Sequence, residues 1–149
     1  RQGVRRLAQF WGHAWQSALF PSGKAFGYIA YPPRPDGRPT FNEGYLYRGD
    51  GELIPARAVR APWLRRLREV GEDVSVVLET ADGTVHIDGE TVYSTHDIHH
   101  DDDTYSVREM KKENPNFPAL QQAGVRYRWD GEETYGMLER SNPLSQIET

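Results

Sequence analysis

Apolar and polar residues alternate along most of this chain with the period of two that is typical of half-buried β-strands. The alternation predicts strands over residues 10–20, 26–31, 41–48, 52–59, 73–80, 91–94, 125–129 and 134–140. Pro55 lacks a backbone N–H, so we expect the strand over 52–59 to lie at an edge or to end early. With the partner expected for 73–80, the chain contains eight to ten strands and no internal repeat.

Five Asp-Gly dipeptides separate or interrupt these segments, at 36–37, 50–51, 82–83, 88–89 and 130–131. Asp-Gly supplies the positive φ angles of tight hairpin turns. A two-residue turn at 82–83 would pair Leu78 with Ile87, which matches apolar with apolar positions. A turn at 130–131 would place Arg128 opposite Glu133, a favourable cross-strand ion pair. The dipeptide at 88–89 predicts a bulge or a second turn.

Two segments depart from the strand pattern. Residues 61–70 have the features of a short helix, with Pro62 at the first helical position, an apolar stripe and Gly71 at the end. Residues 114–124 contain two prolines and are expected to be irregular, with one helical turn at 119–122.

Locally connected strands at this spacing predict an all-β fold. We expect an antiparallel meander that is closed or nearly closed into a lipocalin-like barrel, with at most one or two short helices, because closure removes exposed strand edges. The 149 residues fit a single domain, 1–149. An eight-stranded barrel has room for side chains and one small ligand.

Composition narrows the functional classes. The chain has no cysteine, which excludes disulfides, thiol nucleophiles and iron–sulfur ligation. A formal net charge of −4 argues against nucleic acid as a partner, and no apolar run is long enough for a transmembrane segment. Phosphate-binding and nucleophile-elbow motifs are also missing, so no cofactor is expected. The start at Arg1 suggests an excised domain or a processed product, and a cytoplasmic location is expected.

The pattern around 10–20 yields the first candidate site. Period-two spacing places His13 between Trp11 and Trp15 on one strand face. If that face lines the barrel, two indoles enclose a group that transfers protons near neutral pH, and burial would lower the pKa of the imidazole. A core histidine bonded to a carbonyl is the alternative interpretation.

Further candidates come from the other aromatic strands. We expect the ligand to contact an aromatic interior formed by Trp11, Trp15, Tyr28, Tyr45, Trp129 and Tyr135. Glu139 either faces inward as an acid, base or orienting partner of His13, or faces outward and pairs with a neighbouring arginine.

One cluster admits a metal. His96, His99 and His100 stand beside four aspartates, and these residue types bind zinc, manganese or nickel. No recognised ligand spacing is present, and three consecutive aspartates are typical of a solvated loop. We therefore expect no metal.

Several of these segments together resemble a known family. Trp11-Gly12-His13-x-Trp15, Glu43-Gly44-Tyr45 before Asp50-Gly51, and above all Trp129-Asp130-Gly131 followed by Tyr135-Gly136-x-x-Glu139-Arg140-Ser141 resemble the C-terminal domain of the carotenoid hydratase (hydroxyneurosporene synthase) and lipocalin-like (calycin) superfamily. The resemblance implies that this domain is the C-terminal half of a longer protein with two consecutive barrels. It also implies ligands of terpenoid, carotenoid or polyketide type.

Three functions follow. In the leading interpretation, the barrel binds an apolar or amphipathic small molecule. In the second, His13 and Glu139 transfer protons, and the protein is a cofactor-independent hydratase (a lyase), isomerase or cyclase. In the third, the domain is structural and packs on a partner, either an N-terminal barrel domain or a second copy of the chain in a homodimer.

Overall fold

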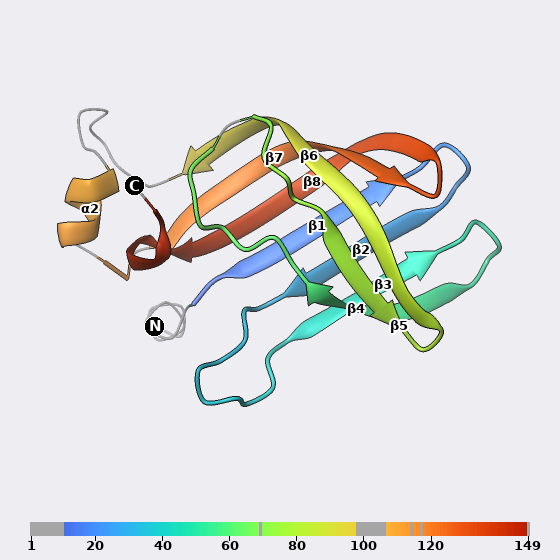
Figure 1. Cartoon of the computed structure of the whole chain (residues 1–149), viewed down its shortest axis with the longest axis horizontal. Coiled ribbons are helices and arrows are strands. Elements are labelled where there is room, and N and C mark those ends of the chain that lie inside the picture. The colour runs from blue at the N-terminus through green and yellow to red at the C-terminus, as the bar shows by residue number, and fades with distance from the viewer. Residues whose placement is uncertain (1–10, 69, 98–106, 114, 117, 149) are drawn as a thin grey trace, which may run out of the picture.

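Eight antiparallel strands, joined in sequence order, form a closed barrel in which β1 pairs with β8 (Figure 1). The computed structural model describes residues 11–68, 70–97, 107–113, 115–116 and 118–148. The strands are β1 (His13–Leu19), β2 (Ala25–Ala30), β3 (Asn42–Tyr47), β4 (Leu53–Arg60), β5 (Val76–Thr80), β6 (Gly83–Asp97), β7 (Pro118–Trp129) and β8 (Glu132–Pro143). A seven-residue helix α2 (Val107–Glu113) and a 3-10 turn η1 (Leu144–Gln146) lie beside one end of the barrel. The predicted all-β meander is confirmed.

Two predicted hairpins have different outcomes. Asp130 and Gly131 both have positive φ, at 53° and 78°, and Arg128 lies opposite Glu133 with Nε 2.7 Å from Oε2, as predicted. The register predicted at 82–83 is wrong by two residues, because the turn uses Ala81 and Asp82 and Leu78 pairs with Val85. A shift of two keeps every side chain on its expected face.

Asp88-Gly89 is neither a turn nor a bulge. Both residues lie inside β6 and pair with β7, and the register shift of β6 comes later, between Thr91 and Tyr93. Glycine at position 89 leaves room for the Tyr127 ring, since a Cβ at this position would come within 3.0 Å of that ring.

Three local predictions are wrong because tertiary pairing outweighs local preference. Residues 118–124 belong to β7, where Ala119, Gln121 and Ala123 point inward, instead of forming an irregular segment with a helical turn. β4 is not an edge, since it pairs with both β3 and β5, and Pro55 lies in the part that pairs only with β3. The described residues of 61–70 contain one isolated β-bridge, between Arg66 and Glu148, and no helix.

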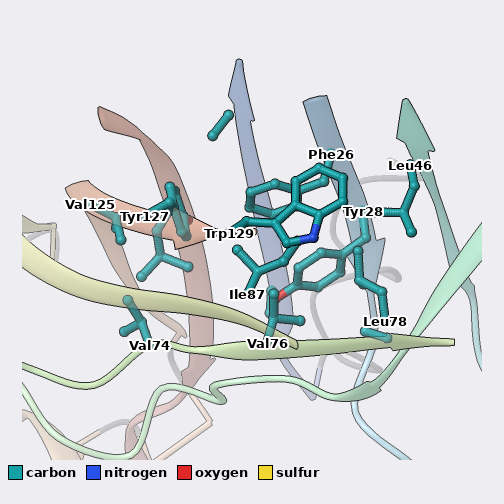
Figure 2. Close-up of a cluster of buried hydrophobic side chains, with 14 of the residues drawn as sticks. Phe26, Tyr28, Leu46, Val74, Val76, Leu78, Ile87, Val125, Tyr127 and Trp129 are labelled. Carbon is teal, nitrogen blue, oxygen red and sulfur yellow. The ribbon is translucent and has the colours of Figure 1, made fainter. Parts of the chain in front are cut away.

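The barrel interior is filled by side chains that converge from opposite strands (Figure 2). Phe26 meets Tyr127 edge to face at a ring-centroid distance of 5.0 Å, and Phe20 meets Trp129 at 5.6 Å. These large residues come from β2 and β7 and from the end of β1. The inward positions of β1 are therefore small or polar, and the interior is a packed core.

A hydrogen-bonded network crosses this core. The Gln16 amide donates to Val74 O and to the Tyr127 hydroxyl, both at 2.9 Å, and the Tyr28 hydroxyl donates to Gln16 Oε1. Tyr127 in turn donates to Met137 O at 3.0 Å. Burial raises the pKa of both tyrosines, so both hydroxyls keep the protons that these bonds need.

Arg140 connects the barrel to the long segment between β4 and β5. Its side chain is 1% exposed and donates from Nε to Gln121 Oε1, from Nη1 to Pro62 O at 2.9 Å and Trp63 O at 3.4 Å, and from Nη2 to the Glu72 carboxylate. In Figure 1 the green trace of this segment leaves β4, passes the ends of β6 and β7 and returns to β5. The carbonyls of 62 and 63 face a guanidinium, which explains why no helix forms there.

We predict that Arg140→Met lowers the free energy of unfolding by about 3–5 kcal/mol, because Glu72 would keep a partly buried charge without its partner. Urea denaturation measures this loss. Arg128→Met is the matched control on the neighbouring strand, since its ion pair is exposed and its removal should hardly change the midpoint. Equal, small effects of the two substitutions would contradict the prediction.

Candidate functional site

A cavity of about 610 Å³ lies at the end of the barrel where β1 begins and β8 ends. We call it the end cavity. Its apolar wall consists of Trp11, Trp63, Pro32, Pro33 and Pro35. Its polar lining includes Arg65, Asn116, Ser141, Asn142 and Glu148. The cavity therefore combines aromatic and proline surfaces with a few polar groups, as small-molecule sites do.

Trp11 is held rigidly at the rim of this cavity. Its indole N–H donates to Pro32 O at 2.8 Å, and its ring meets Tyr31 edge to face at 6.1 Å. The Arg34 guanidinium lies 4.9 Å from the ring centroid in a cation–π contact. Gly12 follows with φ at +115°, and a Cβ there would come within 2.7 Å of Ser141 O. This position therefore requires glycine.

Residues near the end of the described chain, up to Glu148, also form a wall of the end cavity. Glu148 N donates to Arg65 O at 2.7 Å, and the Glu148 carboxylate pairs with Arg66 at 2.7 Å. A small apolar cluster anchors this segment: Leu64, Ala119, Leu144 and Ile147, all buried. Asn142 also donates to Leu64 O at 2.7 Å. The wall depends on packing more than on the exposed ion pair.

Beside the end cavity, β1 and β8 bring three reactive side chains together. His13 lies directly opposite Ser141 in the strand register, and its Nδ1 makes a short hydrogen bond with the Ser141 hydroxyl. Its Nε2 lies 3.2 Å from Glu139 Oε1. The Gln122 amide donates to the other Glu139 oxygen at 2.9 Å. These contacts form a chain from Gln122 to the wall of the end cavity.

The protonation of this chain follows from its partners. Burial lowers the pKa of His13 and outweighs the raising effect of Glu139, so the imidazole is neutral at pH 7. An ionised carboxylate only accepts hydrogen bonds, so Nε2 carries the proton and donates to Glu139. Nδ1 then accepts the proton of the Ser141 hydroxyl. The His13–Glu139 contact is thus a hydrogen bond that a neutral imidazole donates to a carboxylate, rather than an ion pair.

His13 and Glu139 meet as expected, but on the outer face of the barrel wall. The sequence interpretation placed His13, Trp11 and Trp15 inside. Instead Ala14, Gln16 and Ala18 point into the barrel, because the large residues of other strands fill its centre. Glu139 faces outward, as one alternative held, yet its partners are His13 and Gln122 and not an arginine.

The six expected ligand contacts separate into three groups. Tyr28 and Trp129 lie in the interior as predicted, where they form part of the packed core. The predicted interior position is wrong for Trp15, Tyr45 and Tyr135, which lie on the outer face and are 39%, 37% and 66% exposed. Trp11 alone of the six lines the end cavity.

Those three aromatic residues belong to an outer apolar face that spans β8, β1, β2, β3 and β4. Trp15 lies opposite Ile29, Gly27 opposite Tyr45, and Tyr47 opposite Leu53. Packing on a partner, the third interpretation, stays a prediction. Among the described helices, none is long and apolar enough to span a membrane.

The His and Asp cluster that was considered for a metal, and for which no metal is expected, is only partly described. His96 lies in β6, where it pairs in register with Gln121 of β7. His99, His100 and the three consecutive aspartates lie outside the described residues.

Sequence reasoning missed Ser141, Trp63 and Arg65. No local spacing joins Ser141 to His13, since 128 positions separate them. The signal that could have joined them is the register of β1 with β8, which becomes readable once the barrel is assumed to close. Trp63 and Arg65 lie in the segment 61–70, for which a helix was predicted. The segment is not helical, and its path brings both residues to the end cavity.

The fold and the site define a closed, eight-stranded antiparallel barrel that is compatible with the lipocalin-like fold. Comparison with protein-family models, curated proteins and solved structures finds no match to this chain.

We predict that His13 makes stability dependent on pH. Its pKa is lower in the folded than in the unfolded chain, so the unfolded chain binds the proton first as pH falls, and stability decreases below the ordinary histidine range. Between about pH 7.5 and about pH 5.5, the urea midpoint of wild type should fall more than that of His13→Gln. The exposed His86→Gln should behave as wild type, and parallel curves for wild type and His13→Gln would refute the assignment.

Proposed function

We propose that this protein binds an amphipathic small molecule in the end cavity. The observation that carries the proposal is the pairing of two indoles, Trp11 and Trp63, with a cationic side chain, Arg65, in one hollow of about 610 Å³. Ligand sites usually have volumes of about 300–1,000 Å³ and a few polar groups that orient the ligand.

The chemistry of the lining suggests the ligand class. An apolar body fits the indoles and prolines, and Arg65 favours a carboxylate or another anionic head group. The terpenoid-like class implied by the sequence resemblance has this character. The barrel interior is a poorer candidate because its aromatic residues pack against one another.

Tryptophan fluorescence tests this proposal, since the four tryptophans occupy different places. Farnesoic acid, a terpenoid carboxylate that does not absorb tryptophan emission, should change the fluorescence of wild type. Most of that change should disappear in Trp63→Phe or Trp11→Phe and remain in Trp15→Phe, which removes an indole from the outer face. Arg65→Ala should weaken farnesoic acid binding by about 1.5–3 kcal/mol, the range for hydrogen bonds to charged groups.

Farnesol is the matched ligand control, because it keeps the apolar body and lacks the carboxylate. Its affinity should change little in Arg65→Ala. A flat calorimetric titration with both ligands would exclude this ligand class, and a fluorescence change lost only in Trp15→Phe would place the ligand on the outer apolar face.

The hydrogen bond between His13 and Glu139 supports a second candidate function, which is proton transfer to the bound molecule. A neutral imidazole oriented by a carboxylate is a suitable base near neutral pH. Hydration, isomerisation or cyclisation of a polyene would then need no cofactor.

Incubation of the terpenoid probes in D2O followed by mass spectrometry tests this second function. Wild type should give a product heavier by one D2O or an isomer that carries deuterium, and His13→Ala and Glu139→Gln should abolish its formation while ligand still binds. Unchanged turnover in both variants would reject the assignment.

A further inference from the structure

His13, Glu139 and Ser141 are joined by hydrogen bonds between β1 and β8. Of these three residues, only Ser141 lines the end cavity. Ser141 is only 4% exposed. Its hydroxyl is hydrogen-bonded to His13 Nδ1. A molecule held in the end cavity would therefore meet the hydroxyl of Ser141 before it met the imidazole behind it.

Other described hydroxyls donate to oxygen atoms. Ser22 and Ser75 donate to the carboxylates of Glu132 and Asp73, at 2.7 and 2.6 Å, and several hydroxyls donate to backbone carbonyls. Thr134 donates to Leu19 O at 2.8 Å, Ser94 to Arg68 O at 3.3 Å and Thr80 to Gly83 O at 3.0 Å. A hydroxyl that donates to a backbone carbonyl ties two segments together. The Ser141 hydroxyl donates instead to a basic nitrogen.

The groups behind Ser141 complete a serine–histidine–carboxylate array. Glu139 holds His13 through Nε2 at 3.2 Å, and Gln122 holds Glu139 at 2.9 Å. A base in contact with the nucleophile, and a third group that orients the base, are the signature of an activated serine. The roles of the two ring nitrogens are exchanged relative to the usual serine triad, but the proton path is the same.

We propose that Ser141 is a nucleophile that takes the acyl group of a small ester bound in the end cavity. This inference rests on the proposed function, because it needs that cavity to hold a ligand. The substrate class is an ester whose apolar portion lies against Trp11 and Trp63. Arg65, in the same cavity, supplies positive charge for the carbonyl oxygen as it becomes an oxyanion.

The reaction balances with water as the only co-reactant. Ser141 Oγ bonds to the carbonyl carbon while its proton moves to His13 Nδ1. The bond from that carbon to the alcohol oxygen then breaks, and the alcohol leaves with the proton from His13. Water, deprotonated by His13, attacks the acyl-serine, and the carboxylic acid and free Ser141 result. Glu139 keeps its charge throughout and stabilises the imidazolium.

A fluorophosphonate probe, which phosphonylates activated serines, tests the proposal on the whole chain. Peptide mass spectrometry of the treated wild type should locate the adduct on Ser141. Labelling should be absent in Ser141→Ala and about 100-fold or more slower in His13→Gln, which removes the base. Ser17→Ala, a serine-to-alanine change elsewhere on the outer face of β1, should react as wild type.

A wild-type protein that stays unlabelled, or that carries the adduct on another residue, would overturn the proposal. This readout needs no variant, so it decides the question even if Ser141→Ala does not fold. Farnesoic acid binding is measured on the same samples. Binding without labelling would overturn the nucleophile and leave the ligand site standing, whereas loss of both would overturn the proposed function as well.

Discussion

The structure depends most on one buried guanidinium. Arg140 projects from β8 into the end of the barrel, where its donors meet a glutamine of β7, two carbonyls of the β4–β5 segment and Glu72. Burial lowers its pKa, and Glu72 counteracts this effect by favouring the charged form. A buried charge is tolerable only with such partners. The 61–75 segment is therefore held in one path across the barrel end.

That path determines where a ligand could bind. It brings Trp63 and Arg65 to the cavity that Trp11 also lines, and it supplies Leu64, against which Leu144 and Ile147 pack. Meanwhile the barrel centre is occupied by Trp129, Tyr127 and Phe26 and crossed by the Gln16 network. The same sequence therefore fills the interior expected of a small-molecule barrel and opens a hollow at its end.

Local signals predicted the architecture well. The Asp130-Gly131 turn, the Arg128–Glu133 pair and the antiparallel order depend on neighbouring residues, so they can be deduced from the chain alone. The orientation of β1 could not, because an alternating strand has two faces and the choice depends on what the other strands contribute. The bulky face of Trp11, His13 and Trp15 was predicted to point inward. It points outward because large side chains of other strands already fill the core. Residues 118–124 joined β7 because both β6 and β8 pair with them.

The ligand site proposed for this protein is the end cavity and not the barrel interior. A crystal structure of the protein with farnesoic acid tests it most directly. The account predicts ligand density between Trp11 and Trp63, with the carboxylate toward Arg65 and with the core side chains unmoved. Density inside the barrel, with Tyr28 and Trp129 displaced from their present contacts, would contradict it.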